Sequence, residues 1–533
     1  MAEPLDPALT PDVALPALAL QSLLDATGVR EFVICAGARN SALLVMLAAV
    51  PGLRLWHHFE ERSASFFALG RILDHERPVA VVTTSGTAVA ELLPAIIEAH
   101  YQGLPLIALT ADRPVSYRGT GAPQAIEQAG IFGSYPKLAL DVTGLESAPA
   151  ALASLASWDF VGPLHLNLCL EEPTAASLPS LREAGARLRS APAVENKPHR
   201  IKEIPLPDPA AFSAPIVLIG DLLPWETWAV QRFAAELQAP VYAEAASGLR
   251  ESLPLRDLLL GGGDHRLNQH PHGSVIRLGG VPSCRFWRDL ENRPEIPVCS
   301  YTRSGHPGLA RPSLVRGWED CHAKPGFTGD PLFRLDDRLA MLLAAHPDSE
   351  PALVHALSKI IPEEAVMLTG NSLAIREWNL CAQPSSSIHA RALRGANGID
   401  GNLSAFLGLA ADAGEAWCLV GDLTALYDLA APWMLAQLKT PRLRIVVIQN
   451  AGGKIFSRLP ALRGLTDFER QLMENPHTIS LAGWAQQWGL AHLSASHRLP
   501  DLTGLPDRSV IELYPDPEAT EAFWQAWAAH PLL

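Results

Sequence analysis

Short apolar runs rich in β-branched residues alternate with longer amphipathic stretches along the first third of the chain. The runs read EFVICAG, VAVVTTSG, PLIALTAD and PLHLNLCL, at 31–37, 79–86, 105–112 and 163–170. Between them, stretches such as 87–103 have the spacing of apolar residues that predicts a helix. Buried strands that alternate with helices form a parallel sheet covered on both faces, so this region predicts an α/β domain.

The same alternation returns twice further along the chain. It begins again at 214–224 with APIVLIGDLLP, and a third time near Ala352, where AVMLTGNS, EAWCLVGDLTAL, RLRIVVIQNAGG and RSVIELYPD follow one another. With 533 residues, the chain is also too long for one hydrophobic core. We therefore predict an α/β fold of three doubly wound, mainly parallel-sheet domains, at residues 1–185, 200–335 and 345–533. The stretch 171–213 is rich in Pro, Ala, Ser, Arg and Lys without clear periodicity, which predicts a linker.

Composition and charge narrow the class of protein. Hydrophobic residues make up 48% and charged residues 18% of the chain, which is typical of a well-packed globular protein. The net charge of −14 argues against a nucleic-acid partner, and it means that an anionic substrate needs local arginines. The seven cysteines are scattered without a C-x-x-C pair, which predicts reduced thiols, a cytoplasmic protein and no zinc site. The N-terminus lacks a basic segment and the apolar run at 79–99 is interrupted, so we expect neither a signal peptide nor membrane insertion.

Two predicted strands of the last domain end in residues whose side chains carry oxygen. One strand ends at Gly421 and Asp422, and the next along the chain ends at Gln449 and Asn450. In doubly wound sheets, ligands bind at the carboxyl edge, where the strands end. A carboxylate, an amide oxygen and a nearby backbone carbonyl suit Mg²⁺, with a diphosphate completing the shell, and Gly452 lets the backbone approach closely. Taken alone, each segment is equally compatible with an ordinary strand end capped by a polar turn residue.

Two adjacent glutamates stand where the chain passes from a predicted strand into an apolar helix. They are Glu60 and Glu61, in the stretch HHFEERSASFFALG at 57–70. A carboxylate at the start of a helix is stabilised by the positive end of the helix dipole. Glu60 fits this structural explanation better than Glu61, for which it also stays open.

These motifs, in this order and on two α/β domains with a third between them, resemble those of thiamine diphosphate enzymes. More narrowly, six segments resemble the 2-succinyl-5-enolpyruvyl-6-hydroxy-3-cyclohexene-1-carboxylate (SEPHCHC) synthases of menaquinone biosynthesis. The segments are GDLTALYDL, NAGGKIFSRLP, RGANGIDGNLS, TSGTAVAELLPAIIEA, LTADRP and GAPQAIEQAGIF. The resemblance covers both outer domains nearly end to end and is weaker in the middle domain.

The resemblance implies thiamine diphosphate and a Mg²⁺ or Mn²⁺ ion as cofactors. In such enzymes a buried carboxylate, matched here by Glu61, hydrogen-bonds N1′ of the aminopyrimidine and promotes the imino tautomer that takes the thiazolium proton. The metal ligands are matched by Asp422, Asn450 and the carbonyl of Gly452. The full set that matches cofactor contacts is Glu61, Ile399, Asp422, Asn450, Ile455 and Phe456. Ile399 is also compatible with plain core packing, and Ile455 and Phe456, together with Leu459, are also compatible with one apolar helix face.

The substrates that the resemblance implies are 2-oxoglutarate and isochorismate, both dianions. The family decarboxylates the first and adds the resulting succinyl carbanion equivalent to the second by 1,4-addition. Arginine binds carboxylates in a fixed bidentate geometry, and five arginines stand within the matching motifs. The implied substrate-binding residues are Ser372, Arg376 and Arg394 for the succinyl carboxylate, Arg39, Arg113, Gln124 and Arg285 for isochorismate, and Leu459 lining the site. In this cofactor family the site lies between two chains, which implies a homodimer or a tetramer.

Three residues depart from the family pattern near the expected isochorismate site. Ala38, Pro123 and Cys284 stand where Ser, Asn and Lys are usual, and each change removes a donor. The loss of one charged contact costs roughly 1.5–3 kcal/mol. Two alternatives therefore stay open: a thiamine diphosphate-dependent 2-oxo acid decarboxylase or carboligase with another acceptor, and a non-catalytic cofactor-binding paralogue. Retention of the glutamate and of both metal-binding side chains argues against the paralogue.

Overall fold

Three parallel sheets form the framework of this protein. The computed structural model describes residues 10–189 and 212–529, except 262, 264–266, 269–271, 318–336, 384–387, 389, 463 and 503. Every strand pair in these residues is parallel, and the sheets contain six, five and six strands in chain order. The α/β class with three mainly parallel sheets is thus confirmed, whereas the exact domain boundaries stay a prediction.

The chain divides into two compact units. The first unit comprises residues 1–198 together with the short segments 407–409 and 430–438, and the second comprises the remainder. The first sheet belongs to the first unit, and the second and third sheets belong to the second unit. Among the described residues, no helix combines the length and the hydropathy that crossing a membrane requires.

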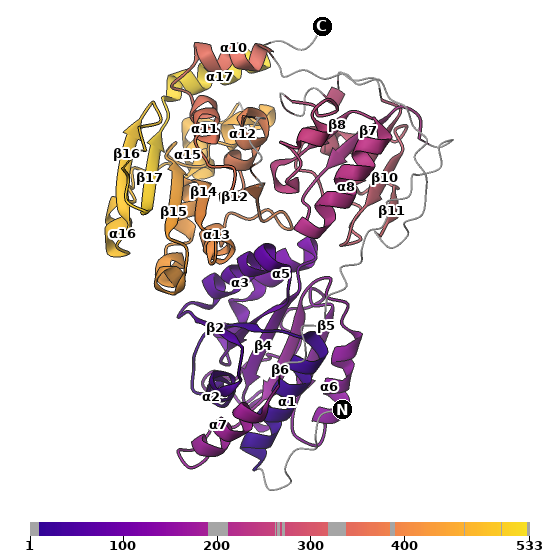
Figure 1. The fold of residues 1–533 in the computed structure, drawn as a ribbon, viewed down its shortest axis with the longest axis vertical. Helices are drawn as coiled ribbons and strands as arrows, with labels where there is room; N and C mark the ends of the chain where they lie inside the picture. Colours follow the sequence, from indigo (N-terminus) through magenta and orange to yellow (C-terminus); the bar gives the residue numbers. More distant parts are fainter. Residues whose placement is uncertain are drawn as a thin grey trace. The chain divides into compact units, whose positions relative to one another are not determined.

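The sheet of the first unit has the strand order β2-β1-β3-β4-β6-β5. Its strands are β1 (Glu31–Ile34), β2 (Arg54–His57), β3 (Val79–Thr83), β4 (Leu106–Asp112), β5 (Leu138–Val142) and β6 (Leu164–Cys169). Its helices are α1 (Pro11–Thr27), α2 (Ser41–Ala49), α3 (Glu61–His75), α4 (Thr87–Ala90), α5 (Leu93–Gln102), α6 (Ala148–Ala153) and α7 (Leu178–Arg187). Helices α3 and α5 cover one face, and α1, α2, α6 and α7 lie together on the other (Figure 1).

Two expectations from the sequence are corrected in this unit. The single helix expected over 87–103 is two helices, α4 and α5, because Pro94 lacks an N–H and is tolerated only in the first turn of a new helix. The linker expected from residue 171 holds helix α7, whose Leu181 is buried. At Gly185 a Cβ would lie 2.4 Å from the carbonyl oxygen of Met46, so glycine lets α7 pack closely on α2. Residues 190–211 of the expected linker lie outside the described residues.

A buried ion pair ties the first strand of this sheet to α3. Arg71 donates to Glu31 through Nε (2.9 Å) and Nη2 (3.0 Å), and His75 Nε2 lies 3.1 Å from the same carboxylate. Burial alone would raise the pKa of Glu31, but the hydrogen bonds of His75 and Arg71 outweigh it and lower the pKa to about 2. At about 1.4 kcal/mol per tenfold change in proton affinity, this lowering corresponds to roughly 3 kcal/mol of stability at neutral pH.

We expect Glu31→Gln to lower the free energy of unfolding by roughly 2–3 kcal/mol at pH 7. Because the native pKa of Glu31 is depressed, its contribution is present above the ordinary carboxyl pKa and is lost as the pH falls toward about 2. The difference between wild type and variant, measured by urea unfolding from pH 7 to pH 3, should therefore shrink on acidification. A difference that is constant with pH would show that the ion pair contributes nothing through the charge of Glu31.

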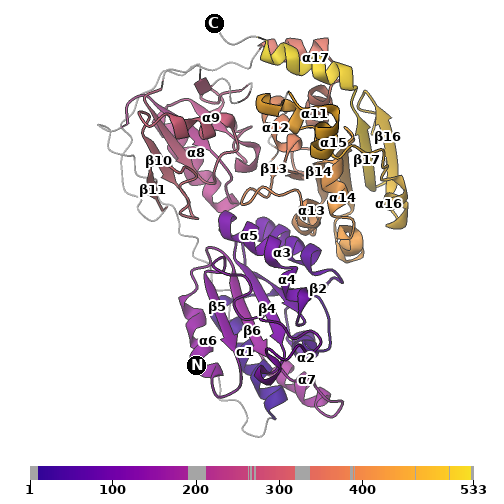
Figure 2. The same ribbon diagram turned by 180° about the vertical axis from the view of Figure 1, so that it is seen from behind.

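The second unit contains two sheets, of orders β11-β10-β9-β7-β8 and β13-β12-β14-β15-β17-β16. Figure 2 labels β10 and β11 in the first of these sheets and β14, β16 and β17 in the other. The strands of the second sheet are β7 (Pro215–Ile219), β8 (Val241–Ala243), β9 (Ser274–Leu278), β10 (Val298–Tyr301) and β11 (Leu314–Arg316). Its helices α8 (Pro224–Leu237) and α9 (Arg285–Asp289) contribute to two separate cores, one on each face of the sheet. Alternate residues of β7 point to these two cores, as expected for a strand covered on both faces.

The third sheet carries the strand ends singled out by the sequence. Its strands are β12 (Val366–Thr369), β13 (Ala390–Arg391), β14 (Glu415–Gly421), β15 (Arg442–Ile448), β16 (Ala491–Ser496) and β17 (Arg508–Tyr514). The helices that accompany these strands in sequence are α10 (Asp337–Ala345), α11 (Glu350–Ser358), α12 (Leu373–Cys381), α13 (Asn402–Ala410), α14 (Asp422–Tyr427), α15 (Asp467–Glu474), α16 (Ala482–Gln487) and α17 (Pro517–Ala528). Helices α11 and α12 pack on one face of the sheet, and α10 and α17 share a smaller core with α11 and α12.

Candidate active site

Strands β14 and β15 end side by side at the carboxyl edge of the third sheet. Gly421 pairs with Ile448 in the parallel register, so Asp422 and Asn450 follow neighbouring strand ends. Asp422 begins α14 and is 2% exposed. Its carboxylate accepts hydrogen bonds from the backbone N–H groups of Leu423 (2.6 Å) and Gly452 (2.9 Å). Burial raises the pKa of Asp422, and these hydrogen bonds offset only part of the effect.

The side-chain amide of Asn450 has a hydrogen-bond partner for its NH₂ group but none for its oxygen among the described residues. Its Nδ2 lies 3.0 Å from each carboxylate oxygen of Glu350. Its Oδ1 is buried and accepts no hydrogen bond from the described residues. A buried acceptor without a donor is costly unless a ligand satisfies it, and a hard divalent cation prefers such an oxygen.

The loop after Asn450 needs glycine for two reasons. Gly452 has φ of +120°, and a Cβ there would lie 2.4 Å from the carbonyl oxygen of Glu474. Gly453 donates its N–H to the same oxygen at 2.6 Å. His477 lies three residues after Glu474 in the sequence, and its Nε2 is 3.4 Å from Asp422 Oδ2. A carboxylate, an unpartnered amide oxygen and a tightly folded glycine loop fit a divalent cation with a diphosphate.

Glu60 and Glu61 divide the two roles that the sequence suggested. Glu60 is the N-cap of α3 and accepts from the N–H groups of Arg62 and Ser63, both at 3.0 Å. Glu61 is the first residue of the helix and is half-buried. Burial is the main cause that raises the pKa of Glu61, and the negative charges of Glu60 and Glu91 raise it further. A carboxyl group with a raised pKa binds a proton more readily than an exposed glutamate does.

The substrate residues expected in the first unit all lie at the carboxyl edge of its sheet. Arg39 follows β1, and Arg113 follows β4 directly. Gln124, whose φ is +58°, lies against Gly86 in the segment after β3. Glu61 follows β2 at the same edge, since all the strands are parallel. The fold therefore brings these four residues to one edge.

Arg39 already has partners within the chain. Its Nη1 donates to the carbonyl of Leu170 (3.0 Å), and its Nη2 pairs with Glu172 (2.9 Å). The Arg39 side chain is buried, whereas Glu172 is 52% exposed. An exposed carboxylate on a buried guanidinium is easily exchanged for the carboxylate of a small molecule.

The three residues expected to bind the succinyl carboxylate follow two paired strands, Ser372 and Arg376 after β12 and Arg394 after β13. Ser372 is the N-cap of α12 with a φ of +68°, and its carbonyl accepts from Arg376 Nη1 at 2.7 Å. Arg394 is buried and donates through Nη1 to Asn371 Oδ1 at 2.7 Å. Its Nε has no hydrogen-bond partner among the described residues, so the guanidinium retains donor capacity.

The remaining residues expected to contact cofactor or substrate differ in how exposed their side chains are. Ile399, Ile455 and Phe456 are partly buried, and Leu459 is exposed. Arg285 begins α9 beside the second sheet, with its side chain 65% exposed and paired with Asp289 (3.5 Å). Arg285 is thus the one arginine among the expected substrate-binding residues that does not belong to the domain of the first or the third sheet.

Sequence reasoning missed three residues that shape the third-sheet site: Glu350, Asn371 and His477. Asn371 donates to the carbonyls of Leu393 and Gly398 and accepts from Arg394, so it holds the segment that carries Ile399. It stands next to Ser372 in a motif that the sequence had already drawn attention to. Glu350 gave no such signal, because a glutamate at a helix start is ordinarily explained by the helix dipole.

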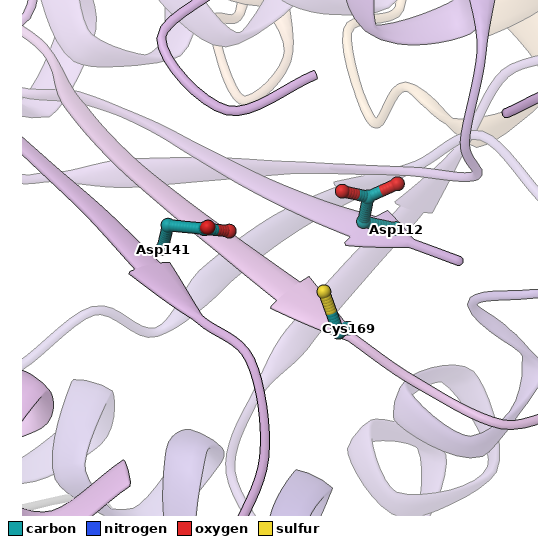
Figure 3. Close-up of side chains that lie close together, drawn as sticks. All are labelled: Asp112, Asp141 and Cys169. Atoms are coloured by element: carbon teal, nitrogen blue, oxygen red, sulfur yellow. The ribbon is translucent and has the colours of Figure 1, made fainter. Parts of the chain in front are cut away.

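An acidic cluster at the first sheet is filled by an arginine. Asp112, Asp141 and Cys169 lie at or next to the ends of three strands, and their side chains lie close together, with the ligand atoms within 4.8 Å of one another (Figure 3). Arg118 Nη2 lies 2.8 Å from Asp112 Oδ2, 2.8 Å from Asp141 Oδ1 and 3.2 Å from Cys169 Sγ. The hydrogen bond to Asp141 is the main cause that raises the pKa of Arg118. The guanidinium occupies the centre of the cluster, so this arrangement anchors the loop after β4 and leaves no place for a metal ion.

We expect Arg118→Met to lower the free energy of unfolding by roughly 2–4 kcal/mol, because Asp112 is fully buried and would lose its counter-charge. Arg187, which pairs with Glu183 on the surface of α7, is the matched control. Arg187→Met should cost less than about 1 kcal/mol. Denaturant unfolding of both variants checks this expectation, and equal losses would contradict it.

Known proteins resemble this chain along nearly its whole length. The N-terminal TPP-binding domain of thiamine pyrophosphate enzymes matches residues 17–131, which include Arg39, Glu61, Arg113 and Gln124. The 2-succinyl-5-enolpyruvyl-6-hydroxy-3-cyclohexene-1-carboxylate synthase of Akkermansia muciniphila is 44% identical over 515 residues, covering 93% of this chain and 95% of the relative. The synthase of the same name from Bdellovibrio bacteriovorus is 41% identical over 541 residues, covering 97% and 98%. This chain belongs to the SEPHCHC synthase family.

Membership of the SEPHCHC synthase family makes this protein a thiamine diphosphate-dependent enzyme that acts on small molecules. The matches to these synthases also span the third sheet, where Asp422 and Asn450 lie. The resemblance inferred from the motifs is thereby confirmed at the level of the family. The individual site residues stay predictions, and the geometry above gives the physical grounds for each.

Proposed function

We propose that this protein decarboxylates 2-oxoglutarate on thiamine diphosphate and adds the succinyl unit to isochorismate by 1,4-addition, as a step of menaquinone biosynthesis. The observation that carries the proposal is the 44% identity to a SEPHCHC synthase over 93% of the chain. The position of Asp422 and Asn450 after the ends of the paired strands β14 and β15 supports it from the structure. The alternative of another acceptor is not favoured by this likeness.

The third sheet is proposed to hold the metal and the diphosphate. Asp422, the Oδ1 of Asn450 and the carbonyl of Gly452 would coordinate Mg²⁺ or Mn²⁺, since the amide oxygen is buried without a partner. Ile399, Ile455 and Phe456 would flank the cofactor with partly buried apolar surface. Thiamine diphosphate, when bound, supplies the carbon nucleophile for both half-reactions.

Glu61 would hold a proton at N1′ of the aminopyrimidine. Its pKa is raised mainly by burial, so its carboxyl group binds a proton more readily than an exposed glutamate does. Glu60 cannot take this role, because both its oxygens cap α3.

The arginines would bind the two dianionic substrates. Arg376 and Arg394, with Ser372, would bind the distal carboxylate of 2-oxoglutarate, and Leu459 would line this site. Arg39, Arg113 and Gln124 would bind isochorismate, with Arg39 exchanging Glu172 for a substrate carboxylate. Arg285 has the weakest support among these residues, because it is exposed beside the second sheet.

We also propose a homodimer or tetramer and a cytoplasmic location. As the resemblance to thiamine diphosphate enzymes implies, Glu61 of one chain would complete the site that Asp422 and Asn450 begin on another chain. The cytoplasmic proposal rests on the cysteines, six of which are free and buried within the described residues.

The test is an assay of the purified protein with thiamine diphosphate, Mg²⁺ and 2-oxoglutarate, with and without isochorismate. We expect loss of isochorismate absorbance that depends on 2-oxoglutarate, together with the succinylated adduct in mass spectrometry. Release of carbon dioxide with isochorismate untouched would mean that the acceptor is wrong. No reaction and no rise in melting temperature with the cofactors would contradict the whole proposal.

A further inference from the structure

A pair of buried carboxyl groups lies behind the proposed metal site. Glu350, the first residue of α11, is 3% exposed, and Glu377, on α12, is fully buried. Burial and then the adjacent charge of Glu350 raise the pKa of Glu377 well above its usual value. Burying two carboxyl groups together is costly, so their presence calls for an explanation.

The contact of Glu350 with Asn450 fixes which way the amide points. Both oxygens of Glu350 lie 3.0 Å from Asn450 Nδ2, and only the NH₂ end of an amide donates hydrogen bonds. A rotated amide would place its oxygen against the carboxylate and lose this contact. Asn450 Oδ1 therefore faces away from Glu350, and it is the atom left buried without a partner.

The backbone of Glu350 is itself held firmly. Ser349 is the N-cap of α11 and accepts from the N–H of Ala352, and the N–H of Glu350 donates to Thr520 Oγ1 at 3.0 Å. Helix α11 packs with α12 on the third sheet. Glu350 is thus a rigid acceptor that reaches the loop after β15 from a different element.

We propose that Glu350 is a positioning residue, which orients the amide of Asn450 so that Oδ1 faces the divalent cation. The inference rests on the proposed function, since it assumes the metal site at Asp422 and Asn450. Hydrogen-bonding partners behind metal ligands typically contribute about 10–100-fold to metal affinity. Glu350 acts through Asn450 and makes no contact with the substrate in this scheme.

The test measures Mn²⁺ affinity of the full chain in saturating thiamine diphosphate, using the electron paramagnetic resonance signal of free Mn²⁺. Glu350→Leu should raise the Mn²⁺ Kd by roughly 10–100-fold. Glu350→Gln should raise it less, by about 3–10-fold, because its amide oxygen still accepts from Asn450. Glu377→Gln is the matched control, because Glu377 is a second buried carboxyl whose hydrogen bond is with Glu350, whereas the amide of Asn450 bonds Glu350. It should change the Kd by less than about threefold.

The melting temperature without cofactors separates positioning from folding. A purely structural role would lower that temperature in Glu350→Gln without changing the Mn²⁺ Kd, which would overturn the inference. If Glu350→Leu does not fold, the Mn²⁺ Kd of Glu350→Gln alone tests the inference. Wild-type Mn²⁺ affinity in every folded Glu350 variant overturns the inference but leaves the proposed function standing. No Mn²⁺ binding by the wild type with thiamine diphosphate overturns both.

Discussion

Replacing Glu61 by glutamine is expected to lower kcat by roughly 10²–10⁴-fold, the range that a positioned proton donor or acceptor contributes. Glutamine keeps the size of the side chain and its hydrogen-bonding capacity, but it cannot hold a titratable proton. The raised pKa of Glu61, caused mainly by burial, is the property that the substitution removes. Because the proposed metal and diphosphate ligands, Asp422 and Asn450, follow strands of the third sheet, cofactor binding should largely persist.

The measurement pairs steady-state kinetics with melting temperature in the presence and absence of thiamine diphosphate and Mg²⁺. Glu60→Gln is the matched control, since it makes the same change of charge one residue away. As the N-cap of α3, Glu60 should affect stability by roughly 0.5–2 kcal/mol and leave kcat within a few fold. A Glu61→Gln variant that keeps more than about a tenth of wild-type kcat would show that another group handles the proton.

The strand ends are the part of the site that the sequence predicts well. Parallel strands run in one direction, so Asp422 and Asn450 are placed at one edge as soon as β14 and β15 are recognised as neighbouring strands. The same rule brings Arg39, Glu61 and Arg113 to the carboxyl edge of the first sheet. These positions follow from the period of the apolar pattern and need no knowledge of side-chain contacts.

Contacts between elements distant in sequence are the part that the sequence could not predict. Glu350 stands 100 residues before Asn450, and nothing in its local pattern indicates that contact. Helix α7 was missed because its stability comes from packing on α2, with Gly185 against Met46, and not from a strong local pattern. In both cases the deciding interaction is tertiary.

The carboxylates that surround each arginine are likewise set by tertiary contacts that the sequence does not predict. Motifs point to both Arg39 and Arg285, the latter in the middle domain, where the resemblance is weaker. The structure buries Arg39 beside Glu172 and exposes Arg285 beside Asp289. Arg118 was not singled out, although it neutralises Asp112 and Asp141 inside the first unit. Whether a guanidinium is free to bind a substrate depends on the carboxylates that the fold places around it, which a linear motif does not record.

Replacing Asp422 by asparagine is expected to remove most of the stabilisation that thiamine diphosphate with Mg²⁺ confers. A ligand at a hundred times its Kd stabilises the native state by about 2.7 kcal/mol, and a hundredfold weaker Kd reduces this to about 0.4 kcal/mol. Without cofactors the variant should be at least as stable as the wild type. Burial raises the pKa of Asp422, which means that the charged carboxylate is disfavoured in the native state, and a neutral amide escapes that cost.

Asp428→Asn is the control for this expectation. Asp428 is also buried, but it accepts from the N–H and the hydroxyl of Ser404, at 2.7 and 2.9 Å. Its replacement should lower the melting temperature without cofactors and leave the rise caused by the cofactors intact. The two aspartates should thus respond in opposite ways, one losing the ligand effect and the other losing intrinsic stability. An unchanged cofactor-dependent rise in Asp422→Asn would show that this carboxylate does not hold the metal, whatever its place at the sheet edge.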